Sequence, residues 1–391
     1  MAERRRAGSW VAAVLAAVPV LLLGAVVYWL VEGGARRWFA TDLPPIENLH
    51  VLRHVLEPDT IHLDIVNAGA DAATIAQVIV RGAFWDHGVT PARRLEALDT
   101  ARVTIPYPWN TGEPVDIALL SATGLTFPYT IEVAAATPVP TLDALVRFGV
   151  IGLFVGVIPV GLGLTWFPFL RRLGTGGLGF LLYLTVGLLA FLVVDSVAEG
   201  FEVAGALPGP YHGKALLVLG VGGAFLALAG VEARGRQRRL TVGSGAWLAT
   251  LIAFGIGLHN LGEGLAIGSA YVLGEVSLGA LLVVGFTLHN ATEGIAIVSP
   301  ILAGGARLSR LVGLGLLAGA PTILGCWIGA FTYSQTWSVL FLGVGAGAIL
   351  QVILAIVGRR PLAEHVTPAH LAGLAVGYLA MYATGYLVGA A

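Results

Sequence analysis

Residues 245–271 read GAWLATLIAFGIGLHNLGEGLAIGSAY, and residues 276–299 read VSLGALLVVGFTLHNATEGIAIVS. Each stretch is apolar and longer than the roughly 20 residues that a helix needs to cross a bilayer. Only a short turn separates them, so we expect two antiparallel membrane helices that lie side by side. The whole chain agrees with this prediction, because 57% of its 391 residues are hydrophobic and only 12% are charged. The composition therefore predicts a polytopic integral membrane protein.

Both stretches contain the pattern HNxxEG. The first copy is formed by His259, Asn260 and Glu263 and the second by His289, Asn290 and Glu293. A histidine and a glutamate four positions apart share one face of a helix. Ionisable side chains are costly in hydrocarbon, so their presence inside a span indicates a functional site. Because both copies lie at similar distances from the connecting turn, we expect the two clusters to meet near the middle of the bilayer.

Neutral imidazole and carboxylate are ligands for zinc, and they also accept iron, manganese, cobalt and cadmium. Two glutamates with two neutral histidines carry a charge of about −2, which one divalent cation cancels. The single cysteine, Cys326, excludes a disulfide framework and a multi-cysteine zinc site, and we interpret it as a core residue. No organic cofactor is predicted. The net charge of −1 does not bear on nucleic-acid binding, but no basic face appears that could follow a phosphate backbone, so no nucleic-acid partner is expected.

Residues 144–391 form the predicted transport domain. We place its eight spans near 144–168, 177–199, 213–233, 245–271, 276–299, 309–332, 337–357 and 369–389. Arginines occur in alternate connections between these spans: Arg171 and Arg172, then Arg234, Arg236, Arg238 and Arg239, then Arg307 and Arg310, then Arg359 and Arg360. Cytoplasmic loops are enriched in Lys and Arg, so these connections are predicted to be cytoplasmic and the C-terminus extracytoplasmic.

The N-terminal residues 1–33 begin with a basic head, Arg4 to Arg6, and continue in an apolar segment from about Trp10 to Val31. We interpret them as a retained anchor helix with a cytoplasmic N-terminus, because the apolar segment is long and no clear small-residue cleavage site follows it. A cleaved signal peptide is the alternative. The predicted location is the plasma (inner) membrane, with multiple crossings.

Residues 40–140 contain no spanning segment and predict a small extracytoplasmic β-sandwich. Short runs rich in β-branched and aromatic residues, IHLDIVNAG, IAQVIVRGAFW, ARVTIPYPW, PVDIALLSA and TFPYTIEVA, are separated by turn-forming residues. Four histidines fall in this region: His50, His54, His62 and His87. We expect them on a solvated sandwich surface, with His62 and Asp64 on one strand face. Metal capture before transport is the alternative.

At the two HNxxEG motifs the chain resembles the ZIP family of divalent metal transporters (zinc/iron permeases). The resemblance covers the eight predicted spans and implies an eight-helix bundle that carries metal into the cytoplasm by an elevator-like motion, and it is consistent with a homodimer. It implies that the primary metal site is formed by His259, Glu263, His289 and Glu293. It also implies that Asn260 and Asn290 face a second metal and that Asp195 is an acidic residue on the transport pathway.

Several positions depart from the pattern of the family. Gly262 and Thr292 stand where many members have a proline before the motif glutamate, so a kink in these helices is less certain. Thr322 stands where members often have a glutamate in the sixth span, which favours one metal over two. Gln351 in the seventh span either lines the pathway or bonds to a neighbouring helix.

An acidic stripe is predicted on the second span. Asp195, Glu199 and Glu202 follow i, i+4, i+7 spacing and share one helix face that leads outward. This stripe is either an entry path for a cation or a set of solvated interfacial carboxylates.

We therefore expect a non-enzymatic transporter of divalent metal ions. One alternative is a ZIP-derived receptor or regulator that keeps the site but does not transport. The other is an intramembrane zinc hydrolase, which normally requires a third protein ligand and a separate general base. Only two histidines lie deep in the predicted spans, because His212, His365 and His370 fall near span ends.

Overall fold

The computed structural model describes residues 17–30, 45–237, 245–273, 276–302, 304–332, 334–358 and 366–389. The chain divides into two units, Met1–Ile46 and Glu47–Ala391. In the first unit, Ala17–Trp29 is a short apolar helix within the predicted anchor. Residues 1–16 and 31–33 of that anchor lie outside the described residues.

Residues 49–131 form two antiparallel sheets. The strands are β1 (Leu49–Glu57), β2 (Thr60–Asn67), β3 (Ala73–Val80), β4 (Ala83–Trp85), β5 (Gly88–Thr90), β6 (Arg94–Leu95), β7 (Thr100–Pro106), β8 (Val115–Ser121) and β9 (Thr126–Ile131). One sheet has the order β1-β2-β7-β5, and the other has the order β4-β3-β8-β9, with β6 paired to β3. On β2, Ile61, Leu63 and Ile65 are buried while His62 and Asp64 between them are partly exposed. This alternation confirms a small antiparallel β region with an apolar core between its sheets.

Two details of this region differ from the sequence-based prediction. The run IAQVIVRGAFW is not one strand but a hairpin of β3 and β4. Arg81 and Gly82, which both have positive φ, form the turn that reverses the chain between the two strands. Strand β1 has no counterpart among the predicted runs. Its sequence, LHVLRHVLE, carries two histidines and an arginine, which obscured the alternation of apolar residues.

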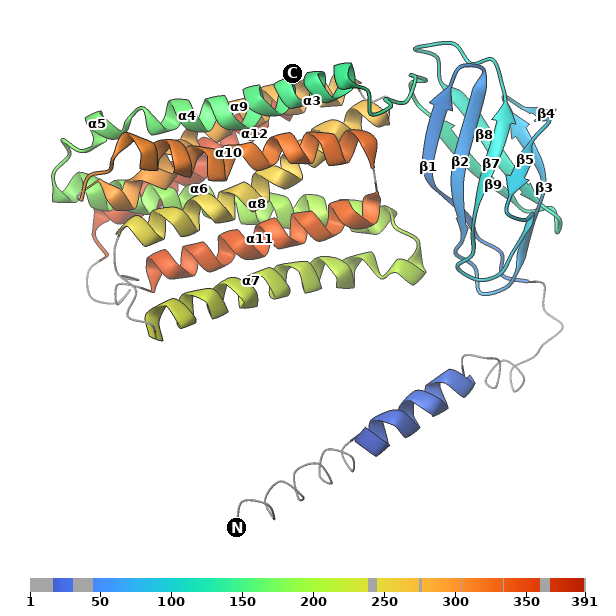
Figure 1. Ribbon diagram of the computed structural model, residues 1–391, viewed down its shortest axis with the longest axis horizontal. Helices are drawn as coiled ribbons and strands as arrows, with labels where there is room; N and C mark the ends of the chain where they lie inside the picture. Colours follow the sequence, from blue (N-terminus) through green and yellow to red (C-terminus); the bar gives the residue numbers. More distant parts are fainter. Residues whose placement is uncertain are drawn as a thin grey trace. The chain divides into compact units, whose positions relative to one another are not determined.

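The remainder of the chain is helical. Its elements are α3 (Leu142–Gly152), η2 (Leu153–Val157), α4 (Ile158–Leu164), α5 (Phe167–Leu170), α6 (Thr175–Ala206), η3 (Gly209–Tyr211), α7 (Gly213–Gln237), α8 (Gly245–Val272), α9 (Val276–Val298), η4 (Ser299–Ile301), α10 (Leu308–Phe331), α11 (Gln335–Val357) and α12 (Pro368–Gly389). Figure 1 shows the long helices side by side in one bundle, in which α8 packs on α10, α6 on α12 and α7 on α11.

Seven helical segments of the described chain are long and apolar enough to cross a membrane. They begin and end within a few residues of the first seven predicted spans, except that α6 continues to Ala206, beyond the predicted end at 199. These seven segments indicate a multi-pass membrane protein. Helix α12 occupies the position of the predicted eighth span, and its crossing of the membrane stays a prediction.

The first span, predicted near 144–168, is not a regular α-helix over its whole length. A π-helical segment, Leu153–Val157, separates α3 from α4. A π segment shifts the helical hydrogen-bond register, so a carbonyl there can accept a bond from outside the helix. The Val155 carbonyl does so, because the side-chain amide of Asn290 donates to it at 2.9 Å.

Glycines bring the two motif helices into backbone contact with their neighbours. A Cβ atom on Gly264 of α8 would lie 2.1 Å from the Thr322 carbonyl oxygen of α10, and one on Gly294 of α9 would lie 2.4 Å from the Val160 carbonyl oxygen of α4. No side chain fits at either place, so glycine permits the close approach. Each HNxxEG motif is thus held against another helix at the residue that follows its glutamate.

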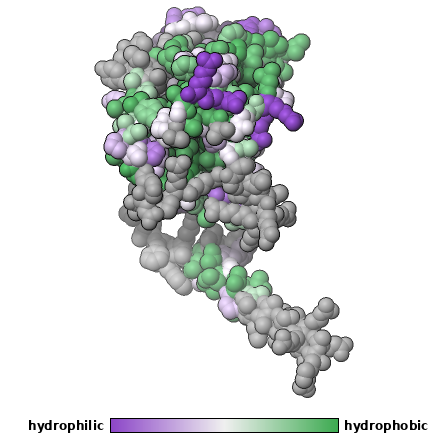
Figure 2. All heavy atoms as spheres, turned by 90° about the vertical axis from the view of Figure 1, so that its left-hand side faces the viewer, coloured by the Kyte–Doolittle hydropathy of each residue, from purple (hydrophilic) through white to green (hydrophobic). Residues whose placement is uncertain are grey.

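Arginines gather at one end of the bundle. Arg171 follows α5 directly and lies beside Gly305, and Arg310 at the start of α10 donates to the Ala246 carbonyl at the start of α8. Figure 2 views the molecule from the side on which α5 lies and shows hydrophilic residues beside hydrophobic ones on this face. Two of the predicted arginine-bearing connections therefore meet at the same end of the helices.

Candidate metal centre

The four ionisable residues of the HNxxEG motifs are buried together. His259 and Glu263 lie on α8 with exposed fractions of 7% and 4%, and His289 and Glu293 lie on α9 with exposed fractions of 8% and 1%. The i, i+4 spacing turns each pair toward the neighbouring helix, as the sequence predicted. Charged side chains are rarely this buried unless they are paired or bind a metal.

The carboxylate of Glu263 bridges the two imidazoles. Its Oε1 atom lies 3.3 Å from Nε2 of His259 and accepts a hydrogen bond from Nε2 of His289. The two rings have centroids 6.3 Å apart. Glu263 on α8 is therefore shared between the histidines of both helices.

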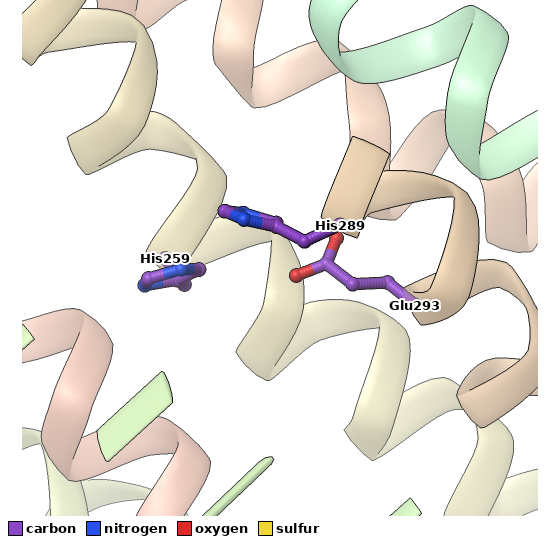
Figure 3. Close-up of side chains that lie close together, drawn as sticks. All are labelled: His259, His289 and Glu293. Carbon is purple, nitrogen blue, oxygen red and sulfur yellow. The ribbon is translucent and has the colours of Figure 1, made fainter. Parts of the chain in front are cut away.

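Three side chains converge closely enough to bind one ion. His259, His289 and Glu293 each offer a ligand atom, and these atoms lie within 4.8 Å of one another. Figure 3 shows His289 and Glu293 extending from one helix toward His259 on the other. Within the described parts of the chain, this is the only such group of three or more His, Cys, Asp or Glu side chains. Nε2 of His259 and Oε1 of Glu293 are buried and have no hydrogen-bond partner among the described residues, so both are available to coordinate an ion.

The two motif asparagines hold the glutamates in a reciprocal way. The amide of Asn260 donates to Glu293 Oε2 at 3.1 Å, and the amide of Asn290 donates to Glu263 Oε2 at 3.1 Å. Each asparagine also donates to a backbone carbonyl, Asn260 to Ala318 and Asn290 to Val155. Each motif thus orients the carboxylate of the other.

The two carbonyls that accept from the asparagines lie in different helices. Val155 is in the π-helical segment, and Ala318 is in α10, which contains Pro321 three residues further along. The Oδ1 atoms of Asn260 and Asn290 are buried, and no described residue forms a hydrogen bond with either. Each asparagine therefore keeps a free acceptor oxygen. The predicted role, in which the asparagines face a metal ion, requires such an oxygen.

Ser196 contacts the site and was not predicted. Its hydroxyl oxygen on α6 lies 3.1 Å from Nδ1 of His259, and both residues are buried. The sequence contained no signal for this contact, because a serine inside a span is ordinary and α6 precedes α8 by two helices. The preceding residue, Asp195, is exposed and does not belong to the group of converging ligands.

The predicted acidic stripe lies on α6, as expected. Glu199 borders a cavity of about 130 Å³ together with Gly262 and Leu265 of α8 and Leu342 of α11. Glu202, one turn further, is exposed. The cavity thus reaches Gly262, the residue directly before Glu263.

Three other positions that the sequence singled out are buried in the helical bundle. The amide of Gln351 on α11 donates to the buried carboxylate of Glu232 on α7 at 2.7 Å, which favours the interpretation that Gln351 bonds to a neighbouring helix. Cys326 is fully buried in α10, as expected for a core residue. Thr322 is also fully buried, and its hydroxyl oxygen would lie 2.2 Å from a Cβ atom on Gly156.

The histidines of the β region are bound locally. His54 forms a hydrogen bond with the Tyr129 hydroxyl at 2.8 Å, and His62 forms one with the Thr104 hydroxyl at 3.0 Å. His54 and His87 are buried, which corrects the expectation that all four lie on a solvated surface. Burial, together with the neighbouring Arg53, lowers the pKa of His54 to about 4. Metal capture by the four histidines has no support, because the described residues of this region contain no group of three ligands.

Comparison with known proteins adds no assignment to this site. Neither a protein-family model nor a curated protein matches the sequence. The candidate metal centre therefore rests on its own geometry: converging ligand atoms, unpartnered coordinating atoms and burial within two helices that are able to cross a membrane.

Proposed function

We propose that this protein transports divalent metal cations across the membrane into the cytoplasm, with zinc as the first candidate. The observation that carries the proposal is the group formed by His259, His289 and Glu293, whose ligand atoms lie within 4.8 Å of one another deep in the helical bundle. The shared carboxylate of Glu263 completes the site. A divalent ion offsets the negative charge of the two glutamates, which is otherwise costly in a low-dielectric interior.

The proposed topology has eight spans, with α12 as the eighth, in the plasma membrane. The arginine-bearing end of the bundle faces the cytoplasm in this arrangement, in agreement with the positive-inside rule. The β region then lies outside the cell. The repeated HNxxEG pattern supports membership of the ZIP family, which we propose together with this topology.

The proposed path runs along α6. A hydrated cation enters past Glu202 and Glu199, passes Asp195, sheds water and binds between the two motifs. The cavity that Glu199 borders, which reaches Gly262, supports this direction of entry. Movement of one set of helices against another then exposes the ion to the cytoplasm. Transporters with a binding site near the middle of the membrane commonly work in this way.

We propose one metal ion per chain. Thr322 offers no carboxylate in the sixth span, and the four His and Glu residues supply one ligand set. Binding requires deprotonated ligands, so affinity is expected to fall as the solution becomes acidic.

Uptake into proteoliposomes tests the transport function. Purified full-length protein is reconstituted, and radiolabelled zinc uptake is compared with that of Glu263→Ala and His289→Ala. Both variants are expected to lose most of the uptake. Glu113→Ala is the matched control, because Glu113 is an exposed carboxylate in the β region that pairs with Arg81.

The same proteins distinguish the alternatives. Equal uptake by the wild type and both site variants would overturn the transport function. Stoichiometric zinc binding without uptake would instead support a receptor or regulator that keeps the site. A metal content of two ions per chain, measured by mass spectrometry of the elements, would contradict the single-metal proposal.

A further inference from the structure

Ser196 lies outside the two motif helices, and its side chain forms a hydrogen bond with a predicted metal ligand, His259. Its hydroxyl oxygen lies 3.1 Å from Nδ1 of His259, and the serine is only 1% exposed. It lies on α6, which packs against α7, α9, α11 and α12. The contact between Ser196 and His259 thus joins the candidate metal centre, which lies between α8 and α9, to a third helix.

The two nitrogens of the His259 ring have different surroundings. Nδ1 faces the Ser196 hydroxyl, whereas Nε2 has no hydrogen-bond partner in the described part of the chain and lies 3.3 Å from Glu263 Oε1. The backbone is also confined, because a Cβ atom on Gly345 of α11 would lie 3.1 Å from the His259 Cα atom. The free nitrogen is therefore the one on the side of the other ligands.

Coordination through Nε2 fixes the proton of a neutral imidazole on Nδ1. That proton needs an acceptor, and the partner of the second ring nitrogen commonly sets the tautomer of a metal-binding histidine. A serine hydroxyl has two acceptor lone pairs and one O–H donor. It can accept from Nδ1–H when metal is bound and donate to Nδ1 when it is not, so it is suited to a site that loads and unloads.

We infer that Ser196 is a positioning residue of the metal centre, which holds the His259 ring so that Nε2 faces the ion. The inference rests on the proposed metal site. It predicts that metal affinity depends on the hydroxyl at position 196, although this hydroxyl does not touch the metal.

Cobalt binding to the purified full-length protein tests this role. Co²⁺ is titrated into the wild type, Ser196→Ala, Ser196→Thr and Ser196→Val, and its visible absorption reports both occupancy and ligand geometry. Threonine and valine have nearly the same shape and differ in the hydroxyl alone. We expect Ser196→Val and Ser196→Ala to weaken cobalt binding about 10- to 100-fold, and Ser196→Thr to bind within a few-fold of the wild type.

A double-mutant cycle separates positioning from packing. Ser196→Ala is combined with His259→Ala, and we expect no further loss of cobalt affinity in the double variant, because the serine acts through the imidazole. Additive losses would overturn the inference and indicate a general packing effect. Equal binding by the wild type, Ser196→Ala and Ser196→Val would overturn it as well. A wild type that binds no cobalt would overturn the proposed site itself, and the role of Ser196 with it.

Discussion

The side-chain amide of Asn260 on α8 donates to Oε2 of Glu293 on α9 over 3.1 Å. The amide of Asn290 on α9 donates to Glu263 on α8 over the same distance. The two motifs are thus interlocked, and neither helix orients its own glutamate alone. Partners of this kind fix the geometry of metal ligands and are often almost as important as the ligands.

Asn260→Leu is expected to destabilise the protein and weaken metal binding. Leucine has a similar size but cannot donate, so the buried Glu293 carboxylate and the Ala318 carbonyl both lose a partner. An unsatisfied buried polar group costs about 1 to 3 kcal/mol. The midpoint of thermal unfolding in detergent should fall, and cobalt affinity should fall with it. An unchanged midpoint would contradict the importance of this interlock.

Gly264→Ala should destabilise the bundle, whereas Gly262→Ala should not. A Cβ atom at position 264 would lie 2.1 Å from the Thr322 carbonyl oxygen, but one at position 262 would lie 3.8 Å from the Leu342 side chain. Overpacking of a tight contact costs about 1 to 3 kcal/mol. Replacing an unhindered helical glycine by alanine is favourable by up to about 1 kcal/mol.

Thermal unfolding of the two glycine variants provides a matched comparison within one helix. The expected order of midpoints is Gly262→Ala at or above the wild type, and Gly264→Ala clearly below it. Equal midpoints for both variants would show that α8 and α10 are not in backbone contact at position 264.

Gln351→Leu is expected to lower stability without affecting metal affinity. The substitution removes the amide that donates to the buried Glu232 carboxylate, and hydrogen bonds to charged groups are worth about 1.5 to 3 kcal/mol. Thr332→Val is the control, because Thr332 is exposed at the end of α10 and its hydroxyl donates to the Ile328 carbonyl one turn earlier. A large loss of cobalt affinity in Gln351→Leu would instead favour the interpretation that this residue lines the pathway.

The stability of the β region should decrease as the solution becomes acidic. Burial holds the pKa of His54 at about 4, below its ordinary value of 6.5, so the folded state resists protonation that the unfolded chain accepts. The contribution of His54 to the stability of the β region is fully present above pH 6.5, and it is lost progressively as the pH falls toward 4. The difference between the two pKa values corresponds to about 3 kcal/mol.

Hydrogen exchange of full-length protein measures this effect in peptides from β1 and β9, after correction for the intrinsic pH dependence of exchange. His54→Gln should remove most of the decrease in protection between pH 6.5 and 4. A decrease of equal size in the variant would assign the acid sensitivity to other groups.

Much of the helical architecture is readable from the sequence, because in a membrane each span must satisfy its own backbone and be apolar over its length. The first seven predicted spans correspond to helical segments of the structure for this reason. The β region was predicted as a class but not strand by strand, since short strands with polar residues, such as β1, carry little periodic signal.

The buried cluster of histidines and glutamates could also be predicted, because ionisable residues in apolar stretches are conspicuous and i, i+4 spacing defines a helix face. The π-helical break in the first span could not, because it depends on how the Val155 carbonyl meets Asn290 across 135 positions of sequence.

The sequence by itself therefore determined the seven long apolar helices and the two His/Glu faces, which follow from local composition and helical period. The tertiary structure alone decided the exchange of partners between Asn260 and Glu293 and between Asn290 and Glu263, and the contact of Ser196 with His259. These contacts join residues of different helices, and their geometry is set by how closely glycine allows the backbones to approach.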